Sequence, residues 1–413
     1  EIVVRERLSE REGKTASGTT IRARRNSATG EWLPAAGNLV VRCDSSTALN
    51  PGDRAVVRGK IYPFTARHGG YGRLMTRRGY VGTLYLNRSS LLLRDTLHRE
   101  LPPKHLSLFL HERAVARLDR LSLAPDEQAL CNAMTAGDRR SLSPALRAAY
   151  SRSGTSHLLA VSGLHVGIVF LLANLLLWWL PLFRHGHILR NIAVILLIWL
   201  YAATTGFPPS VVRAALMFSV LQFALASSSE YVGMNTLAGV AFVMLLFHPD
   251  YLFDISFQLS FIAVAGIIAW GLPLCRLLRT RRKSIDMLTA TLAIGFSASA
   301  ATAPLISHTF GQISVVGLAL NPVVILLSYV VVGSCTLWLV IPGTALAPLF
   351  SVVAGFAARA QNELIRAAAA LPAAALDIRL TTTQCWSVYG LFIFATLLLW
   401  SAERKKSVSS LPE

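Results

Sequence analysis

The chain has 413 residues, of which 53% are hydrophobic and only 15% are charged, with a mean hydropathy of +0.49. Apolar runs of about 20 residues mark membrane spans, so this composition excludes an ordinary soluble enzyme. The formal net charge of +18 attracts phosphate-rich partners, either nucleic acid or anionic lipid headgroups.

The charge divides the chain into two parts. Residues 1–157 carry 26 Lys and Arg against 14 Asp and Glu, net +12, and residues 158–413 carry 14 against 8, net +6. This distribution predicts a basic, water-soluble front and a membrane domain behind it. The five cysteines are scattered and include no CxxC pair, so they predict neither a disulfide framework nor a zinc site. The chain begins at Glu1 without a signal peptide, and we expect its natural start to be missing.

Residues 1–94 are expected to form a small β domain. Short alternating stretches are separated by turn signals such as Asn-Pro-Gly-Asp at 50–53. About five strands in a segment of this length suit a small closed barrel, and an OB-like fold is the natural candidate. The strand stretches lie at 18–24, 38–43, 54–61 and 79–86.

The charge and the aromatic residues of this domain indicate a partner. Residues 1–94 carry 17 basic and 7 acidic residues, net +10, with aromatic side chains interleaved among the bases. A positive groove with stacking aromatics is what single-stranded nucleic acid binding needs. The alternative is that the aromatics fill the barrel core and the arginines are only solvated. The candidate DNA-binding residues are Arg22, Arg24, Trp32, Arg58, Lys60 and Tyr62.

Residues 95–152 are interpreted as a linker that contains an amphipathic helix at 105–121. The leucines of this helix share one face, and its arginines flank that face. The pattern fits a helix that lies in the membrane interface with its bases near lipid phosphates. The alternative is an ordinary linker helix packed on the barrel.

Residues 153–413 are expected to form an α-helical membrane domain of about nine spans. The segment 313–341 is too long for one straight span, because 29 residues at about 1.5 Å each give about 43 Å against a hydrocarbon core of about 30 Å. Asn321 and Pro322 lie inside it and favour a broken helix. The nine apolar segments are 158–180, 189–205, 208–227, 232–247, 251–272, 286–306, 313–341, 343–357 and 385–401.

Basic residues in the short loops predict the orientation of these spans. Basic clusters at 184–190, 276–283 and 404–406 fall on one side of the membrane, whereas the loops before the third, fifth and seventh spans carry no Lys or Arg. Basic loops stay in the cytoplasm, so the barrel lies outside and the C-terminus inside. We therefore expect a multi-pass protein of the cell inner membrane.

A long motif, SGTSHLLAVSGLHVG, occupies residues 153–167. It resembles the signature of the ComEC-type competence protein family, which supplies the inner-membrane channel for incoming transforming DNA. The front resembles the OB-like domain of that family, and the resemblance covers nearly all of the chain. Further matching segments follow in order: PSVVRA at 209–214, FQLSF at 257–261, APL at 303–305, HTFG at 308–311 and Asn321-Pro322.

The resemblance implies a channel component that translocates single-stranded DNA into the cytoplasm during natural transformation. The implied partners are single-stranded DNA, membrane lipids, a DNA receptor, a cytoplasmic translocation ATPase, a separate nuclease and, in a homo-oligomer, further copies of the chain. Many family members also carry leading membrane helices and a metallo-β-lactamase-like domain, but this chain has no HxHxDH motif. We therefore expect no enzymatic activity and no cofactor. The alternative is a membrane transporter or enzyme for another anionic substrate, such as a lipid or polysaccharide precursor.

Polar residues in the spans are candidates for lining a DNA path, because phosphates cannot cross hydrocarbon unsolvated. Arg213 and Asp254 lie at a similar shallow depth and predict a pair at the channel mouth, unless Arg213 snorkels to headgroups. His157 and His165 lack a third ligand for a metal, and Ser162 lacks a nucleophile elbow, so we expect no metal and no catalytic residue. The pore-lining candidates are His157, Ser162, His165, Arg213, Asp254, Gln258 and Asn321.

Overall fold

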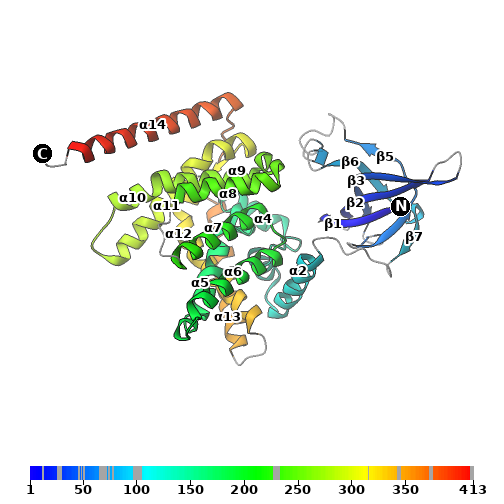
Figure 1. Cartoon of the computed structure of the whole chain (residues 1–413), viewed down its shortest axis with the longest axis horizontal. Coiled ribbons are helices and arrows are strands. Elements are labelled where there is room, and N and C mark those ends of the chain that lie inside the picture. The colour runs from blue at the N-terminus through cyan, green and yellow to red at the C-terminus, as the bar shows by residue number, and fades with distance from the viewer. Residues whose placement is uncertain are drawn as a thin grey trace. The chain divides into compact units, whose positions relative to one another are not determined.

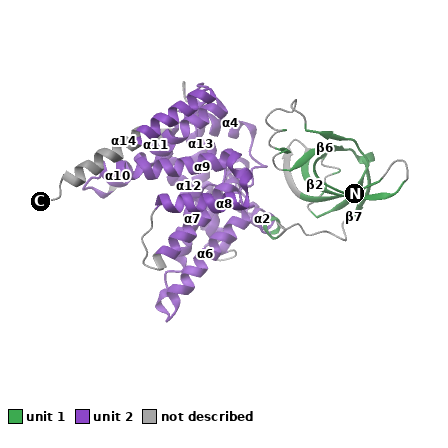
Figure 2. Cartoon of the chain, turned by 45° about the horizontal axis from the view of Figure 1, so that its top comes forward, with its two compact units in different colours: residues 1–109 green, residues 110–413 purple. Residues whose placement is uncertain are grey.

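The computed structural model, drawn in Figure 1, describes the chain except for residues 12–13, 26–29, 45–46, 48, 50–51, 65–71, 73–74, 77–78, 96–104, 227–232, 315, 342–345, 372–374 and 410–413. The chain divides into two units, residues 1–109 and residues 110–413, which have different colours in Figure 2. Residues 110–152, which the sequence analysis assigns to a linker, belong to the second unit.

Unit 1 contains a seven-stranded sheet in the order β5-β6-β3-β2-β1-β4-β7. Neighbouring strands are antiparallel except β3 and β6, which run parallel. Buried and exposed residues alternate at both ends of β6, and its Leu84 and Leu86 join Leu39 and Val41 of β3 in the core. The strands are β1 (Ile2–Arg11), β2 (Lys14–Arg25), β3 (Trp32–Asp44), β4 (Arg54–Val57), β5 (Ile61–Pro63), β6 (Tyr80–Leu86) and β7 (Leu91–Asp95).

The sheet is not a closed barrel in the described part of the chain. Its outer strands, β5 and β7, each pair with one neighbour, and β5 has only three residues with which to pair. The predicted closed, OB-like barrel of about five strands is therefore not confirmed. In the predicted turn at 50–53, Gly52 has a φ of +91° and its N–H donates to the carbonyl of Val4 (2.8 Å), whereas Asn50 and Pro51 lie outside the described residues.

Unit 2 is helical, with a two-stranded ribbon of β8 (Ile313–Ser314) and β9 (Ala375–Leu376). A π-helical turn, Ile267–Gly271, joins α9 and α10 into one continuous span. The helices are α2 (His105–Leu118, shared with unit 1), α3 (Pro125–Thr135), α4 (Pro144–Arg152), α5 (Gly163–Leu176), α6 (Gly186–Thr204), α7 (Pro209–Ala226), α8 (Gly233–Phe247), α9 (Ile255–Gly266), α10 (Leu272–Leu277), α11 (Lys283–Phe310), α12 (Val316–Val340), α13 (Ala347–Ala369) and α14 (Thr382–Ser409).

Unit 2 has the apolar helices of a multi-pass membrane protein. Within the described residues, five segments are long and apolar enough to span a membrane: Gly163–Leu182, Gly186–Thr204, Ile255–Leu277, Ile285–Phe310 and Leu320–Val340. The predicted count of nine spans is not confirmed. The apolar stretches of α7 and α8 are shorter than a full span, and the second half of α13 contains charged residues. The last predicted span falls in α14, and most of its side chains from residue 395 onward lie outside the described residues.

Helix α12 continues through Asn321 and Pro322, so the predicted broken helix is wrong. Pro322 lies in the second turn of the helix, where its missing N–H removes a single backbone hydrogen bond. Membrane helices tolerate such a proline because neighbouring groups satisfy the freed carbonyl. The predicted segment 313–341 is instead the short strand β8 followed by one long helix.

A buried core joins helices α2, α3, α4, α12 and α13 of unit 2. Val115 and Leu118 of α2 and Leu121 after it are buried in this core. Trp338 of α12 donates its ring N–H to the carbonyl of Arg117 (3.3 Å), and Ser351 of α13 donates to that of Leu121 (3.0 Å). At these residues, the apolar face of α2 that was predicted to contact lipid is therefore covered by protein.

Candidate functional site

The N-terminal ends of α5, α7, α9 and α12 meet at one end of unit 2. The Ser210 hydroxyl at the start of α7 donates to the carbonyl of Val161, just before α5 (2.9 Å). Arg213 of α7 donates to the carbonyl of Ser260 in α9 (2.8 Å). Gly317 of α12 lies so close to the loop before α5 that an added Cβ would stand 2.9 Å from the carbonyl oxygen of Ser153. The predicted pore-lining residues all lie near this end, which we call the helix-start end.

The loop at 153–155 opens the family-like motif and fixes the start of α12. Gly154 has a φ of +75°, and a Cβ on it would lie 2.3 Å from the Cβ of Ser314. Ser153 and Thr155 are fully buried on either side, and their hydroxyl oxygens are 2.7 Å apart. Only glycine combines this backbone conformation with so close an approach.

Ser162 and His165 form the first turn of α5. His165 is fully buried, and its Nδ1 accepts a hydrogen bond from the backbone N–H of Ser162 (3.1 Å). This bond assigns the ring proton to Nε2, which is buried without a partner among the described residues, as is the Ser162 hydroxyl. Because Nδ1 is occupied by a donor, no carboxylate orients this ring as in a Ser-His-Asp triad.

Arg213 is a buried cation that connects three helices. Its side chain is 6% exposed, and its Nη1 donates to the Ser260 carbonyl of α9. The guanidinium lies 5.7 Å from the ring centroid of Phe261, and a Cβ on Gly163 of α5 would be 3.1 Å from its Nη2. Its Nε is buried without a partner, and no carboxylate pairs with it among the described residues.

Asp254 does not hold Arg213, so the predicted pair at the channel mouth is wrong. The Asp254 carboxylate caps α9 by accepting from the backbone N–H groups of Ser256 (2.8 Å) and Phe257 (3.2 Å). A short acid before a helix takes this position because the first N–H groups of a helix have no intrahelical partner. Gln258 donates to the carbonyl of Leu252 (2.8 Å) and reinforces the same turn.

Loss of this cap is expected to destabilise unit 2 modestly. Asp254→Ala should lower the free energy of unfolding by about 1 kcal/mol, because two backbone donors lose their acceptor. Asp254→Asn keeps an acceptor oxygen and should stay within a few tenths of a kcal/mol of the parent. Thermal unfolding of both variants in nanodiscs checks this. Equal destabilisation by both variants would show that the charge matters and would contradict the capping role.

The structure separates the other predicted pore-lining residues. Gly163, which faces Arg213, and His165 are two positions apart, about 200° around α5, so His165 points to the opposite side. His157 is exposed in the turn before α5. Asn321 lies in the second turn of α12, and its buried Oδ1 has no hydrogen-bond partner in the described part of the chain. The described residues contain no group of three His, Cys, Asp or Glu that could hold a metal ion.

The six predicted DNA-binding residues of unit 1 fall into two clusters. Arg22, Arg24 and Trp32 lie on the β2–β3 hairpin, where Trp32 is 50% exposed beside Arg25 of β2. Arg58, Lys60 and Tyr62 lie next to β6 and are exposed. Tyr62 of β5 pairs with Thr83 of β6, which in turn pairs with Val40 of β3. Trp32 lies eight residues before Val40 on β3, so the two clusters are about 26 Å apart along this strand.

Tyr85 and Arg42 extend the second cluster, although the sequence analysis did not name them. Tyr85 is 53% exposed, and its ring makes an edge contact with that of Tyr62, with centroids 5.8 Å apart. Arg42 pairs with Tyr85 in the β3–β6 register and is exposed on β3. Two open aromatic rings beside arginine match a stacking surface for unpaired bases. The alternating pattern of 79–86 is the signal that could have identified Tyr85.

Comparisons with known proteins agree with the motif at 153–167. A family model described as "Competence protein" matches residues 134–405. ComE operon protein 3 of Bacillus subtilis (strain 168) is 33% identical over 223 residues, which are 53% of this chain and 27% of that protein. An uncharacterized protein of Aquifex aeolicus (strain VF5) is 29% identical over 201 residues, 48% of this chain and 45% of that protein. The matches thus span less than half of either relative, and no solved structure matches.

Proposed function

Because the chain belongs to the competence protein family, we propose that it acts in DNA uptake as the membrane component through which one strand of DNA reaches the cytoplasm. The observation that carries this proposal is Arg213, a buried cation with no carboxylate partner in the described residues, at the end where four helices begin. A buried cation without a counter-charge is costly, and intramembrane cations mark the paths of charged substrates. A backbone phosphate of a passing strand supplies the missing negative charge.

Unit 1 captures the strand in this proposal. Its net charge over residues 1–94 is +10, and its exposed Tyr62 and Tyr85 offer faces on which bases stack. The distribution of Lys and Arg supports an orientation with the basic loop at 276–283 and the C-terminus in the cytoplasm, and unit 1 and the helix-start end are outside in this proposal. The strand therefore meets basic sheet and arginine before it meets hydrocarbon.

Unit 2 conducts the strand and does no chemistry on it. The Nδ1 of His165 is blocked by the Ser162 N–H, and Asp254 caps its own helix, so neither residue is arranged for hydrolysis. Degradation of the second strand falls to a separate nuclease in this proposal. A DNA receptor, a cytoplasmic ATPase, membrane lipids and further copies of the chain are the other proposed partners.

The stacking surface gives the direct test. The full chain in nanodiscs is expected to bind a fluorescent oligothymidylate, and its affinity should fall as the salt concentration rises. In a plot of log affinity against log salt concentration, each phosphate contact should contribute a slope of about −0.7. Tyr62→Ala and Tyr85→Ala should each weaken binding by about tenfold, since one stacked base is worth about 1–3 kcal/mol. Fluorescence anisotropy measures both effects.

The matched controls are Tyr62→Phe and Tyr85→Phe, which keep the ring and should bind like the parent. Binding that ignores salt, or the absence of binding at low salt, would contradict the proposed function. Preference for an anionic lipid or polysaccharide over DNA would point to a transporter of another anionic substrate.

A further inference from the structure

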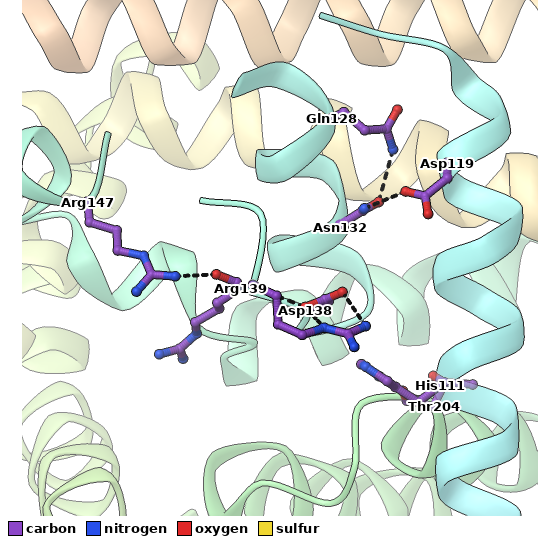
Figure 3. A network of polar contacts seen from close by, with 9 residues as sticks. His111, Asp119, Gln128, Asn132, Asp138, Arg139, Arg147 and Thr204 are labelled. Atoms are coloured by element: carbon purple, nitrogen blue, oxygen red, sulfur yellow. Dashed lines mark hydrogen bonds and ion pairs between the residues drawn. The ribbon is translucent and has the colours of Figure 1, made fainter. Parts of the chain in front are cut away.

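Two arginines outside the membrane-spanning helices, Arg139 and Arg147, lie together without an acid between them. Arg139 is in the loop after α3, and Arg147 is in the first turns of α4. The Arg147 Nη2 donates to the backbone carbonyl of Arg139, which holds the Arg147 guanidinium beside the Arg139 backbone (Figure 3). Partial desolvation and, after it, the charge of Arg147 lower the pKa of the Arg139 guanidinium.

The neighbouring acid is already occupied. Asp138 is buried, and its carboxylate accepts from the backbone N–H (3.0 Å), Nε (2.9 Å) and Nη2 (2.8 Å) of Arg140. Burial alone would raise the pKa of Asp138, but the bonds and the charge of Arg140 outweigh it and lower the pKa. Asp138 therefore neutralises Arg140. Among the described residues the Arg139 guanidinium has no hydrogen-bonding or ionic partner, and the Arg147 Nε is buried without one.

The loop that holds this pair packs against the helix-start end. Gly137 has a φ of +82°, and a Cβ on it would lie 3.3 Å from Val161 Cγ2 and 3.6 Å from the carbonyl oxygen of Thr205. His111 of α2 donates to the carbonyl of Thr204, at the end of α6 just before α7 begins (3.0 Å; Figure 3). The pair thus stands beside the loops that lead into α5 and α7, whose Gly163 and Arg213 meet.

We propose that Arg139 and Arg147 together bind a backbone phosphate of single-stranded DNA before the strand reaches Arg213. Two like charges held together repel each other, and an anion between them reverses the sign of that interaction. A guanidinium presents parallel N–H donors that match two phosphate oxygens, so the pair makes a more specific contact than two lysines would. This inference rests on the proposed function, since it assigns the phosphate to the strand that enters.

The test uses the full chain in nanodiscs of zwitterionic lipid and a fluorescent oligothymidylate. Arg139→Gln and Arg147→Gln are each expected to weaken binding about tenfold or more, which is the lower end of the range for a hydrogen bond to a charged group. Each lost phosphate contact should also reduce the log–log salt slope by about 0.7. Arg139→Gln is the cleaner variant because its guanidinium makes no described contact, and thermal unfolding confirms the fold of each protein.

Arg140→Gln is the matched control, because it removes the same charge from the next residue but from a cation that Asp138 already neutralises. It is expected to lower thermal stability while leaving the salt slope close to that of the parent. Equal slopes for Arg139→Gln and Arg140→Gln would overturn the assignment while the proposed function stands. Failure of the parent chain to bind the oligonucleotide would instead remove the proposed function. An effect seen only with anionic lipid in the nanodisc would assign the pair to headgroups and overturn the proposal.

Discussion

Replacement of Gly154 by alanine is expected to destabilise unit 2 by about 3 kcal/mol or more. The left-handed backbone at φ +75° costs a residue with a Cβ about 1–2 kcal/mol. The added Cβ would also stand 2.3 Å from that of Ser314, so the loop and the start of α12 must separate, which adds about 1–3 kcal/mol. Thermal unfolding in nanodiscs and the amount of protein recovered from the membrane measure the loss.

Gly206 supplies the matched control for this substitution. Its φ is +82°, but nothing lies within 4 Å of an added Cβ, so Gly206→Ala should show only the backbone part of the effect. Ser314→Gly removes the colliding Cβ and should restore part of the stability of Gly154→Ala. If Gly154→Ala and Gly206→Ala unfold alike, the close approach between the 153–155 loop and α12 does not exist.

Arg213→Met is expected to reduce DNA uptake by about tenfold or more while the protein is still made. Methionine fills much of the same volume but brings no charge to the helix-start end, and a tenfold effect corresponds to about 1.4 kcal/mol, which one charged hydrogen bond can supply. Arg213→Lys keeps the charge but loses the planar fork that reaches both Ser260 and the Gly163 side, so uptake should fall less. Transformation frequency is the measurement, in a host whose own gene is replaced by a full-length gene with this sequence.

Substitution of Arg190 is the control that distinguishes a role of Arg213 in the DNA path from a role in packing. It is also partly buried, and its Nη2 donates to the side-chain and backbone oxygens of Asn174 (2.9 and 3.3 Å), at the opposite end of α5. Arg190→Met should lower thermal stability without a matching loss of transformation. If transformation in both variants simply follows the amount of folded protein, Arg213 is a structural clamp and its place in the DNA path is wrong.

Most of the helical unit could be predicted from apolar runs alone. The predicted segments 208–227 and 232–247 agree with α7 and α8 within two residues at each end. A membrane forces this agreement because a spanning segment must satisfy its own backbone groups. The predicted segment 343–357 covers only the first half of α13, because Gln361 and Asn362 interrupt the apolar run. Both side chains are nevertheless buried and bond Tyr150 of α4. Their partner is more than 200 residues away, and an apolarity pattern carries no such information.

In the candidate site too, the sequence reveals individual residues but not their long-range partners. Arg213 is visible in the sequence because a charge in an apolar helix is rare, whereas its acceptor, the Ser260 carbonyl, is a backbone atom without a sequence signature. The sequence suggested Asp254 as the partner because it lies at a similar depth, but its own helix already uses this carboxylate as a cap. Arg139 and Arg147 are eight positions apart across a loop, and only the fold brings them together. The number of strands in unit 1 likewise depends on pairing across the chain, which local alternation does not determine.

The π-helical turn Ile267–Gly271 changes the direction in which the residues after it point, relative to those before it, within the span Ile255–Leu277. A π turn holds one residue more than an α-helical turn, and one residue corresponds to about 100° of rotation around the axis. Arg276, which is exposed at the far end of the span, therefore faces a direction that an uninterrupted α-helix of the same length would not give it. The number of residues between Asp254 and the basic loop at 276–283 and the kind of turn that they form, and not their hydrophobicity, together decide where that loop points. Deletion of one residue in this turn would convert it to an ordinary α-helical turn, so the hydropathy of the span and the direction of the loop should both be kept.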